Sequence, residues 1–183
     1  MKKLLIKKDS ELTDKEIKEI HQASVREFHE PFTKTVGHES RGRLLFLLKN
    51  ENDKVIAMGQ LIPVEPVQFR GETFSILGIG GIVSNIKGKG YGKKIMTAIK
   101  QYLIKNCKTG IGFCGLSNRP FYEKCGFFVN QNSLQRFVYY EKSKKIVNVE
   151  DEAVLYFDSD DHFMEKALAY PTEEVLLPRP PNW

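Results

Sequence analysis

Hydrophobic residues recur along the chain at two different spacings, which predict helices and strands. Apolar residues at helical spacing follow Thr13-Asp14-Lys15-Glu16, a capping box in which a hydroxyl and a carboxylate satisfy the first helical amides. The pattern therefore predicts a helix over residues 14–28. A second helix is predicted over residues 91–106, where one face is apolar, and a short one starts at Ser117-Asn118 and runs to Lys124.

Short apolar runs bounded by turn residues predict strands between these helices. They cover residues 43–49, 54–62, 73–83, 111–116, 134–140 and 153–157. Pro63 and Pro66 are expected to interrupt the edge after the second strand, and a lysine-rich connector is expected before the last. The order predicts one α+β domain over residues 1–183, in which antiparallel strands precede a single parallel crossover.

Glycine is concentrated at the end of the long central strand and in the loop that follows. The strand contains Gly78, Gly80 and Gly81, and glycine inside a strand marks a bulge or a close backbone approach. In the loop, Gly88, Gly90 and Gly92 alternate with lysines directly before a predicted helix. Amides at a helix N-terminus bind anions, and glycines let the anion come close, so the loop predicts a phosphate site.

The spacing separates three kinds of phosphate loop. A Walker A loop needs GxxxxGK[ST], and here Gly92-Lys93 is followed by Lys94. The dinucleotide pattern GxGxxG also fails, because Lys93 and Ile95 stand where the third glycine is needed. The third pattern, Q/R-x-x-G-x-G/A after a central strand, fits KGKGYG at 87–92 with lysine at the first position.

Residues 74–127 resemble the core of the GNAT (Gcn5-related N-acetyltransferase) superfamily. The resemblance rests on the strand FSILGIGGIVS, the loop KGKGYGKKIM, the strand IGFCGLS and the helix SNRPFYEKCGF. It implies the acyl-CoA N-acyltransferase fold: a mixed, mostly antiparallel central sheet with helices on both faces and one splayed parallel strand pair. It also implies acetyl-CoA as the co-substrate of an N-acetyltransferase.

The same resemblance implies which residues contact acetyl-CoA. Backbone amides of the loop would hold the pyrophosphate, and N–H groups near Ile82 and Val83 would hold pantetheine and polarise the thioester. Asn118 and Phe121 would line the other side. The complete set is Ile82, Val83, Lys87, Gly88, Lys89, Gly90, Tyr91, Gly92, Lys93, Asn118 and Phe121.

Tyr122 is the candidate catalytic residue, because relatives commonly carry a tyrosine acid there that protonates the departing thiolate. A phenol of pKa about 10 suffices for a thiolate of comparable basicity. The alternative is an aromatic that packs against CoA or in the core. Gly80 stands where some relatives carry a glutamate base, so the general base is left open. It is another residue, such as Glu30, His38 or Glu39, or it is solvent, or no base is needed.

The chain carries a formal net charge of +5, yet residues 150–183 hold nine acidic and two basic side chains. The length, the central strand, FYEKCGF and the terminal Trp183 resemble the aminoglycoside 2′-N-acetyltransferases, in which an acidic carboxyl-terminal segment helps to bind the aminoglycoside. The chain departs from that family at Gly80 and at Arg179-Pro180-Pro181-Asn182-Trp183, where an aspartate is expected. The predicted acceptor is therefore a primary amine of a small molecule, polycationic or not, or of a peptide.

Other classes of function are less consistent with the sequence. No apolar run approaches the about 18 residues of a membrane span, and the amino-terminal apolar patch is too short for a signal peptide. Cys107, Cys114 and Cys125 lack a metal-ligand spacing and are expected to be free thiols in the cytoplasm. The lysines cluster at the glycine loop, which argues against a nucleic-acid-binding protein. A non-catalytic CoA-binding regulatory module and a homodimer both remain open.

Overall fold

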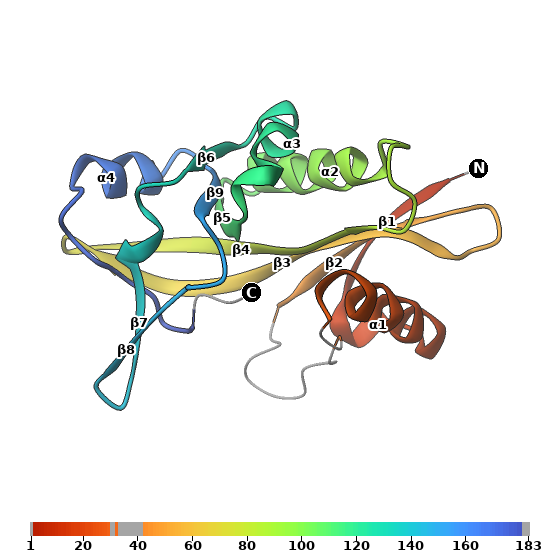
Figure 1. The fold of residues 1–183 in the computed structure, drawn as a ribbon, viewed down its shortest axis with the longest axis horizontal. Helices are drawn as coiled ribbons and strands as arrows, with labels where there is room; N and C mark the ends of the chain where they lie inside the picture. Colours follow the sequence, from red (N-terminus) through yellow and green to blue (C-terminus); the bar gives the residue numbers. More distant parts are fainter. Residues whose placement is uncertain (1, 30–31, 33–41, 181–183) are drawn as a thin grey trace. The chain divides into compact units, whose positions relative to one another are not determined.

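A computed structural model describes residues 2–29, 32 and 42–180. The chain divides into two compact units, one of residues 1–62 and 80–99, the other of residues 63–79 and 100–183. Figure 1 shows the order of the elements. The strands are β1 (Lys3–Lys8), β2 (Leu44–Lys49), β3 (Val55–Phe69), β4 (Glu72–Ser84), β5 (Thr109–Cys114), β6 (Phe128–Asn130), β7 (Phe137–Glu141), β8 (Lys144–Val147), β9 (Ala153–Phe157) and β10 (Val175–Leu176). The α-helices are α1 (Asp14–Phe28), α2 (Tyr91–Lys105), α3 (Arg119–Lys124) and α4 (Phe163–Ala169).

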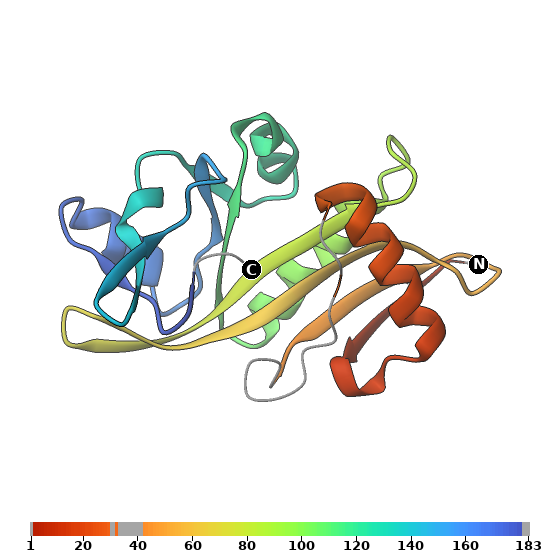
Figure 2. The same cartoon turned by 60° about the horizontal axis from the view of Figure 1, so that its bottom comes forward.

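In the first unit, an antiparallel sheet carries a helix on each face. β2 pairs with β1 from Leu44↔Lys8 to Lys49↔Lys3, and with the first part of β3. One face packs on α1 through a core that includes Ile20, Leu47 and Met58. Because side chains alternate along a strand, Gly59 points to the other face, where a Cβ would lie 2.7 Å from the side chain of Ile95 in α2. Figure 2 shows α1 and the first turns of α2 on opposite sides of these strands.

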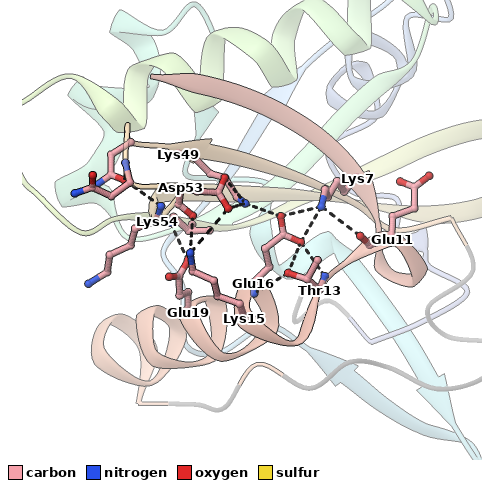
Figure 3. Close-up of polar contacts among 12 residues, drawn as sticks. Lys7, Glu11, Thr13, Lys15, Glu16, Glu19, Lys49, Asp53 and Lys54 are labelled. Carbon is pink, nitrogen blue, oxygen red and sulfur yellow. Dashed lines mark hydrogen bonds and ion pairs between the residues drawn. The ribbon is translucent and has the colours of Figure 1, made fainter. Parts of the chain in front are cut away.

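The predicted first helix is confirmed, and its cap belongs to a buried cluster of charges (Figure 3). The Glu16 amide donates to Thr13 Oγ1 at 3.2 Å, and the Thr13 amide donates to Glu16 Oε2 at 2.8 Å. The Glu16 carboxylate is 1% exposed and accepts from Lys7 Nζ at 2.8 Å and Lys49 Nζ at 3.0 Å. Lys49 also contacts Asp53 at 3.0 Å. The cluster therefore ties α1 to β1, β2 and the turn after β2.

Burial and hydrogen bonds act in opposite directions on Glu16. Burial disfavours the ionised carboxylate, but hydrogen bonds from Lys7, from the Thr13 amide and from Lys49 outweigh it. Together they lower the pKa of Glu16 from 4.5 to about 2. The carboxylate is therefore ionised throughout the physiological pH range.

In the second unit, β5 lies between β4, which is parallel to it, and β9, which is antiparallel. β9 also pairs with β6, and β7 pairs with β8 and with β10. In addition to the predicted β4–β5 pair, β7 and β10 form a second, short parallel pair. The core is rich in aromatic residues, such as Phe74 and Phe163, whose ring centroids are 5.0 Å apart.

Arg136 stabilises the carboxyl end of α4. Its guanidinium donates to the backbone oxygens of Ala167 at 2.6 Å, Tyr170 at 2.7 Å and Glu173 at 2.9 Å. A cation beside carbonyls that lack helical partners is favourable, because these carbonyls carry the negative end of the helix dipole.

The expected interruption at Pro63 and Pro66 is wrong, since β3 continues to Phe69. Strict alternation would place Val64 and Val67 on opposite faces, yet both lie in the core of the second unit. The lysine-rich connector is also partly wrong, because residues 144–147 form β8 as the second strand of a hairpin.

Five of the described helices and strands have no counterpart in the sequence prediction: β1, β6, β8, α4 and β10. The other described helices and strands lie within a few residues of their predicted positions, apart from the longer carboxyl end of β3. The three cysteines are free, as expected, and Cys114 and Cys125 are buried. In the described part of the chain, no helix has the length and apolarity needed to cross a membrane.

Candidate functional site

The glycine loop lies in the first unit, between the end of β4 at Ser84 and the start of α2 at Tyr91. Gly88 and Gly90 have φ of +74° and +72°, and a Cβ on either would meet nothing within 4 Å. The backbone conformation, and not crowding, therefore requires glycine there. The Gly90 carbonyl accepts from the Lys94 amide at 3.1 Å, so the helix begins immediately after the loop.

Asn85 anchors the base of this loop to β3. Its amide donates to the Ile56 carbonyl at 2.9 Å, and its side chain donates to the Val55 carbonyl at 2.8 Å. The Asn85 side-chain oxygen accepts from Arg26 of α1. Sequence reasoning missed Asn85, because nothing in SNIKGKG distinguishes an anchoring asparagine from an ordinary turn residue.

The first turn of α2 leaves positive charge available to a ligand. Its first amides lack partners within the helix, and no acidic residue lies in that turn. Among the described residues, Lys89, Lys93 and Lys94 form no ion pair. Lys87 differs from them, because its ammonium contacts the Glu27 carboxylate of α1. The loop can therefore offer backbone donors and unpaired cations to an anion.

Towards the end of β4, the backbone departs from a regular strand at Gly81. Its φ is +58°, a left-handed conformation that side chains rarely adopt. A Cβ there would also lie 3.3 Å from Nε2 of Gln60, on β3. This agrees with the predicted bulge near Gly80 and Gly81. The next two residues, Ile82 and Val83, are the predicted thioester contacts, and Val83 is buried.

In the second unit, the parallel register of β4 and β5 runs from Ile76↔Thr109 to Ile79↔Gly112. β5 continues to Cys114, two residues beyond the last pair. A Cβ on Gly112 would lie 2.5 Å from the Ile79 carbonyl oxygen, so only glycine allows the two strands to approach so closely.

The remaining predicted site residues lie on or beside α3, also in the second unit. Asn118 is exposed and precedes the helix, and Phe121 and Tyr122 are half-buried. Their ring centroids are 5.1 Å apart. The structure thus places the predicted residues in two groups, with the loop and the end of β4 in one unit and α3 in the other.

Burial changes the acid strength of Tyr122. Burial, together with the nearby Cys114, Asp151 and Cys125, raises the pKa of its hydroxyl above the ordinary value of 10. Tyr122 is therefore protonated at neutral pH, and it is a weaker acid than the free phenol assumed from the sequence. Burial, with Asp151 and Glu152 nearby, also raises the pKa of the Cys114 thiol to about 11, which makes that thiol a poor nucleophile.

Several acidic residues of the carboxyl-terminal segment already have partners. Asp158 accepts from the Met164 amide at 3.0 Å and the Glu165 amide at 2.8 Å, and so caps α4. Glu173 pairs with Arg70, and Glu174 with Lys145. These contacts neutralise part of the charge on which the polycation prediction depends. Glu30, His38, Glu39 and Trp183 lie outside the described residues.

Comparisons with known proteins identify the family of this chain. The sequence profile of the Acetyltransferase (GNAT) family matches residues 11–127, which is more than half of the chain. The chain belongs to the GNAT family. No curated protein matches the chain by sequence.

Solved structures with the GNAT fold resemble this chain at low sequence identity. An acyl-CoA N-acyltransferase from Pseudomonas aeruginosa aligns with a TM-score of 0.59 and 18% identity over 85% of this chain and 99% of its own. ElaA of Escherichia coli aligns with a TM-score of 0.58 and 14% identity over 86% of this chain and 100% of its own. The GNAT family N-acetyltransferase YhbS of Escherichia coli was solved in complex with CoA. It aligns with a TM-score of 0.58 and 14% identity over 95% of this chain and 88% of its own. These likenesses establish the fold of this GNAT protein.

Proposed function

We propose that this GNAT protein is an acetyl-CoA-dependent N-acetyltransferase that acts on a primary amine of a small molecule or peptide. The observation that carries the proposal is the loop before α2, where Gly88 and Gly90 adopt positive φ in open space. Such a loop fits a diphosphate, because the amides of residues 87–93 can approach its oxygens without interference from side chains. Lys89 and Lys93 add charge that no other described residue neutralises.

Bound acetyl-CoA supplies an activated acyl group, and the protein must stabilise charge that develops on the thioester oxygen. The main-chain N–H groups near Ile82 and Val83 are the proposed donors, since they follow the bulge at Gly81. The amine must also lose a proton before it can attack. An alkylammonium of pKa about 10.4 is neutral so rarely at pH 7 that this deprotonation costs roughly 4.6 kcal/mol.

Tyr122 stays the predicted proton donor to the departing thiolate. Its raised pKa keeps the proton on the hydroxyl at neutral pH. It also makes the transfer to a thiolate, whose conjugate acid has a pKa of about 8.5, less favourable than transfer from a free phenol. The general base remains unassigned.

Two observations favour a second candidate, a CoA-binding regulatory module without catalytic activity. Gly80 provides no side chain where some relatives carry a glutamate, and burial weakens Tyr122 as an acid. Such a module would bind CoA through the same loop but would release no thiol from acetyl-CoA.

The class of amine is a further part of the proposal. The acidic carboxyl-terminal segment favours a polycation, such as an aminoglycoside, by simple electrostatics. The ion pairs of Glu173 and Glu174 reduce that attraction. Mono-amines, polyamines and a lysine-containing peptide therefore belong in the same acceptor panel as an aminoglycoside.

A homodimer also stays a proposal, for which sedimentation velocity is the direct measurement.

Calorimetric titration with CoA tests the proposal when Gly90→Ala is compared with Gly71→Ala. Gly71 has φ of +80°, and nothing lies within 4 Å of its Cβ position, so both variants strain the backbone alike. Only Gly90→Ala changes the loop, and we expect it to weaken CoA binding about tenfold, which is about 1.4 kcal/mol. Equal effects in the two variants, or no binding by the unmodified protein, would overturn the proposal. CoA binding without thiol release from acetyl-CoA by any amine would favour the regulatory module.

A further inference from the structure

Gln60 lies directly beside the bulge of β4, on the face of the sheet that carries α1. Its register partner on β2 is Leu45, and both Leu45 and Met58 belong to the core under α1. Side chains two residues apart on a strand share a face, so Gln60 extends that face beyond Met58. The Gln60 side chain packs against Gly81: its Nε2, Cδ and Cγ atoms lie within 3.5 Å of the position that a Cβ on Gly81 would occupy.

The amide oxygen of Gln60 is buried and, among the described residues, has no hydrogen-bond partner. Such atoms are uncommon, because a buried polar group without a partner costs free energy. Many apolar residues could fill the same space without that cost. An unpartnered acceptor beside a left-handed glycine therefore indicates a donor that the described part of the chain does not supply.

We propose that Gln60 Oε1 accepts a hydrogen bond from the N–H of the acceptor amine. This inference rests on the proposed function, because Gly81 immediately precedes the backbone donors proposed for the thioester oxygen. An amine held at Gln60 would thus lie beside the group that it attacks, and Gln60 would be a substrate-binding residue.

The chemistry of an amide suits this role better than that of a carboxylate. A carboxylate next to an amine stabilises the ammonium form and raises its pKa, which opposes attack. An amide oxygen accepts from an N–H while carrying no net charge, so it orients the amine with a smaller effect on its ionisation. This arrangement suits a chain that has glycine, and not glutamate, at position 80.

Steady-state kinetics with three variants tests the inference. The probes are acetyl-CoA with ethylamine, putrescine, spermidine, tyramine, an aminoglycoside and a lysine-containing peptide, and the amine that gives the fastest thiol release is used. Gln60→Leu removes the acceptor atom. Gln60→Glu adds a charge at the same place. Gln68→Leu is the control, because Gln68 is an exposed glutamine on the same strand that bonds to Thr73 Oγ1 at 2.8 Å.

For Gln60→Leu we expect KM for the amine to rise about tenfold, with KM for acetyl-CoA unchanged. The melting temperature should stay the same or increase, since an unpartnered polar atom is replaced by an apolar group of similar size. For Gln60→Glu we expect the rise of kcat with pH to move to higher pH by about one unit, because the ammonium is stabilised. Gln68→Leu should change none of these quantities.

Two results would overturn the inference while the protein still acetylates amines. In the first, Gln60→Leu leaves both KM values unchanged. In the second, it lowers the melting temperature and alters both KM values together, which indicates a structural role. Failure of the unmodified protein to bind CoA, or CoA binding without acetylation of any amine, would instead overturn the proposed function, so the two kinds of failure are distinguishable.

Discussion

The pKa values of buried acidic groups shift in opposite directions in the two units. In the first unit, hydrogen bonds from Lys7, Thr13 and Lys49 keep Glu16 ionised and outweigh its burial. In the second unit, burial raises the pKa values of Tyr122, Cys114 and Tyr156, and their neighbouring charges are negative. The comparison shows that burial alone does not decide the charge state of a group; the donors and charges around it do.

The largest effect is expected from the charge cluster at Glu16. Glu16→Gln leaves the partly buried Lys7 without its counter-ion and leaves the buried Lys49 with Asp53 alone. We expect the free energy of unfolding to fall by about 3–5 kcal/mol. Glu173→Gln is the control, because the Arg70–Glu173 pair is exposed, and its loss should cost about 1 kcal/mol or less. Urea denaturation at pH 7 measures both. Similar losses in the two variants would contradict the contrast between a buried and an exposed ion pair.

Acid should weaken the first unit in a defined pH range. The pKa of Glu16 is lowered from 4.5 to about 2 on folding, so its contribution is fully present above pH 4.5 and is lost as pH falls towards 2. The contribution is about 3 kcal/mol, since one pKa unit corresponds to about 1.4 kcal/mol. Denaturation curves measured between pH 6 and pH 2 give the free energy of unfolding at each pH. This free energy should fall more steeply with decreasing pH in the unmodified protein than in Glu16→Gln. Equal slopes would contradict the prediction.

Tyr122 and Tyr156 provide a sharper comparison within the second unit, because burial raises the pKa of both hydroxyls. If Tyr122 protonates the thiolate, Tyr122→Phe should lower kcat about 100-fold, or about 2.7 kcal/mol, without weakening CoA binding. Tyr156→Phe should leave kcat within about twofold, because no catalytic role is proposed for β9. Thiol release from acetyl-CoA and calorimetry with CoA measure the two quantities. An equal loss of kcat in both variants would remove the special role of Tyr122.

Local signals predicted most of the fold. The capping box at Thr13 and the apolar face of α2 each specify a helix within a few residues, so they could be recognised without tertiary information. The short strands β6 and β10 could not. Val175 and Leu176 form a strand only because Phe137 and Val138 lie beside them, a partner that is far away in the sequence.

The candidate site was predictable only in part, and for the same physical reason. The glycine spacing identified the loop, since a positive φ limits the residue types locally. Gln60 carries no local signal, because its position depends on the backbone of Gly81 on a neighbouring strand. The raised pKa of Tyr122 likewise depends on residues from several elements, including Cys114 and Asp151.

Neither unit is a continuous piece of chain, since their boundaries fall inside β3, β4 and α2. A protein cut at these boundaries would end two strands and one helix in mid-element and expose their hydrogen-bonding edges. Gene fragments that encode one unit alone are therefore poor candidates for independent folding, and the two units would have to be gained, lost or transferred together during evolution.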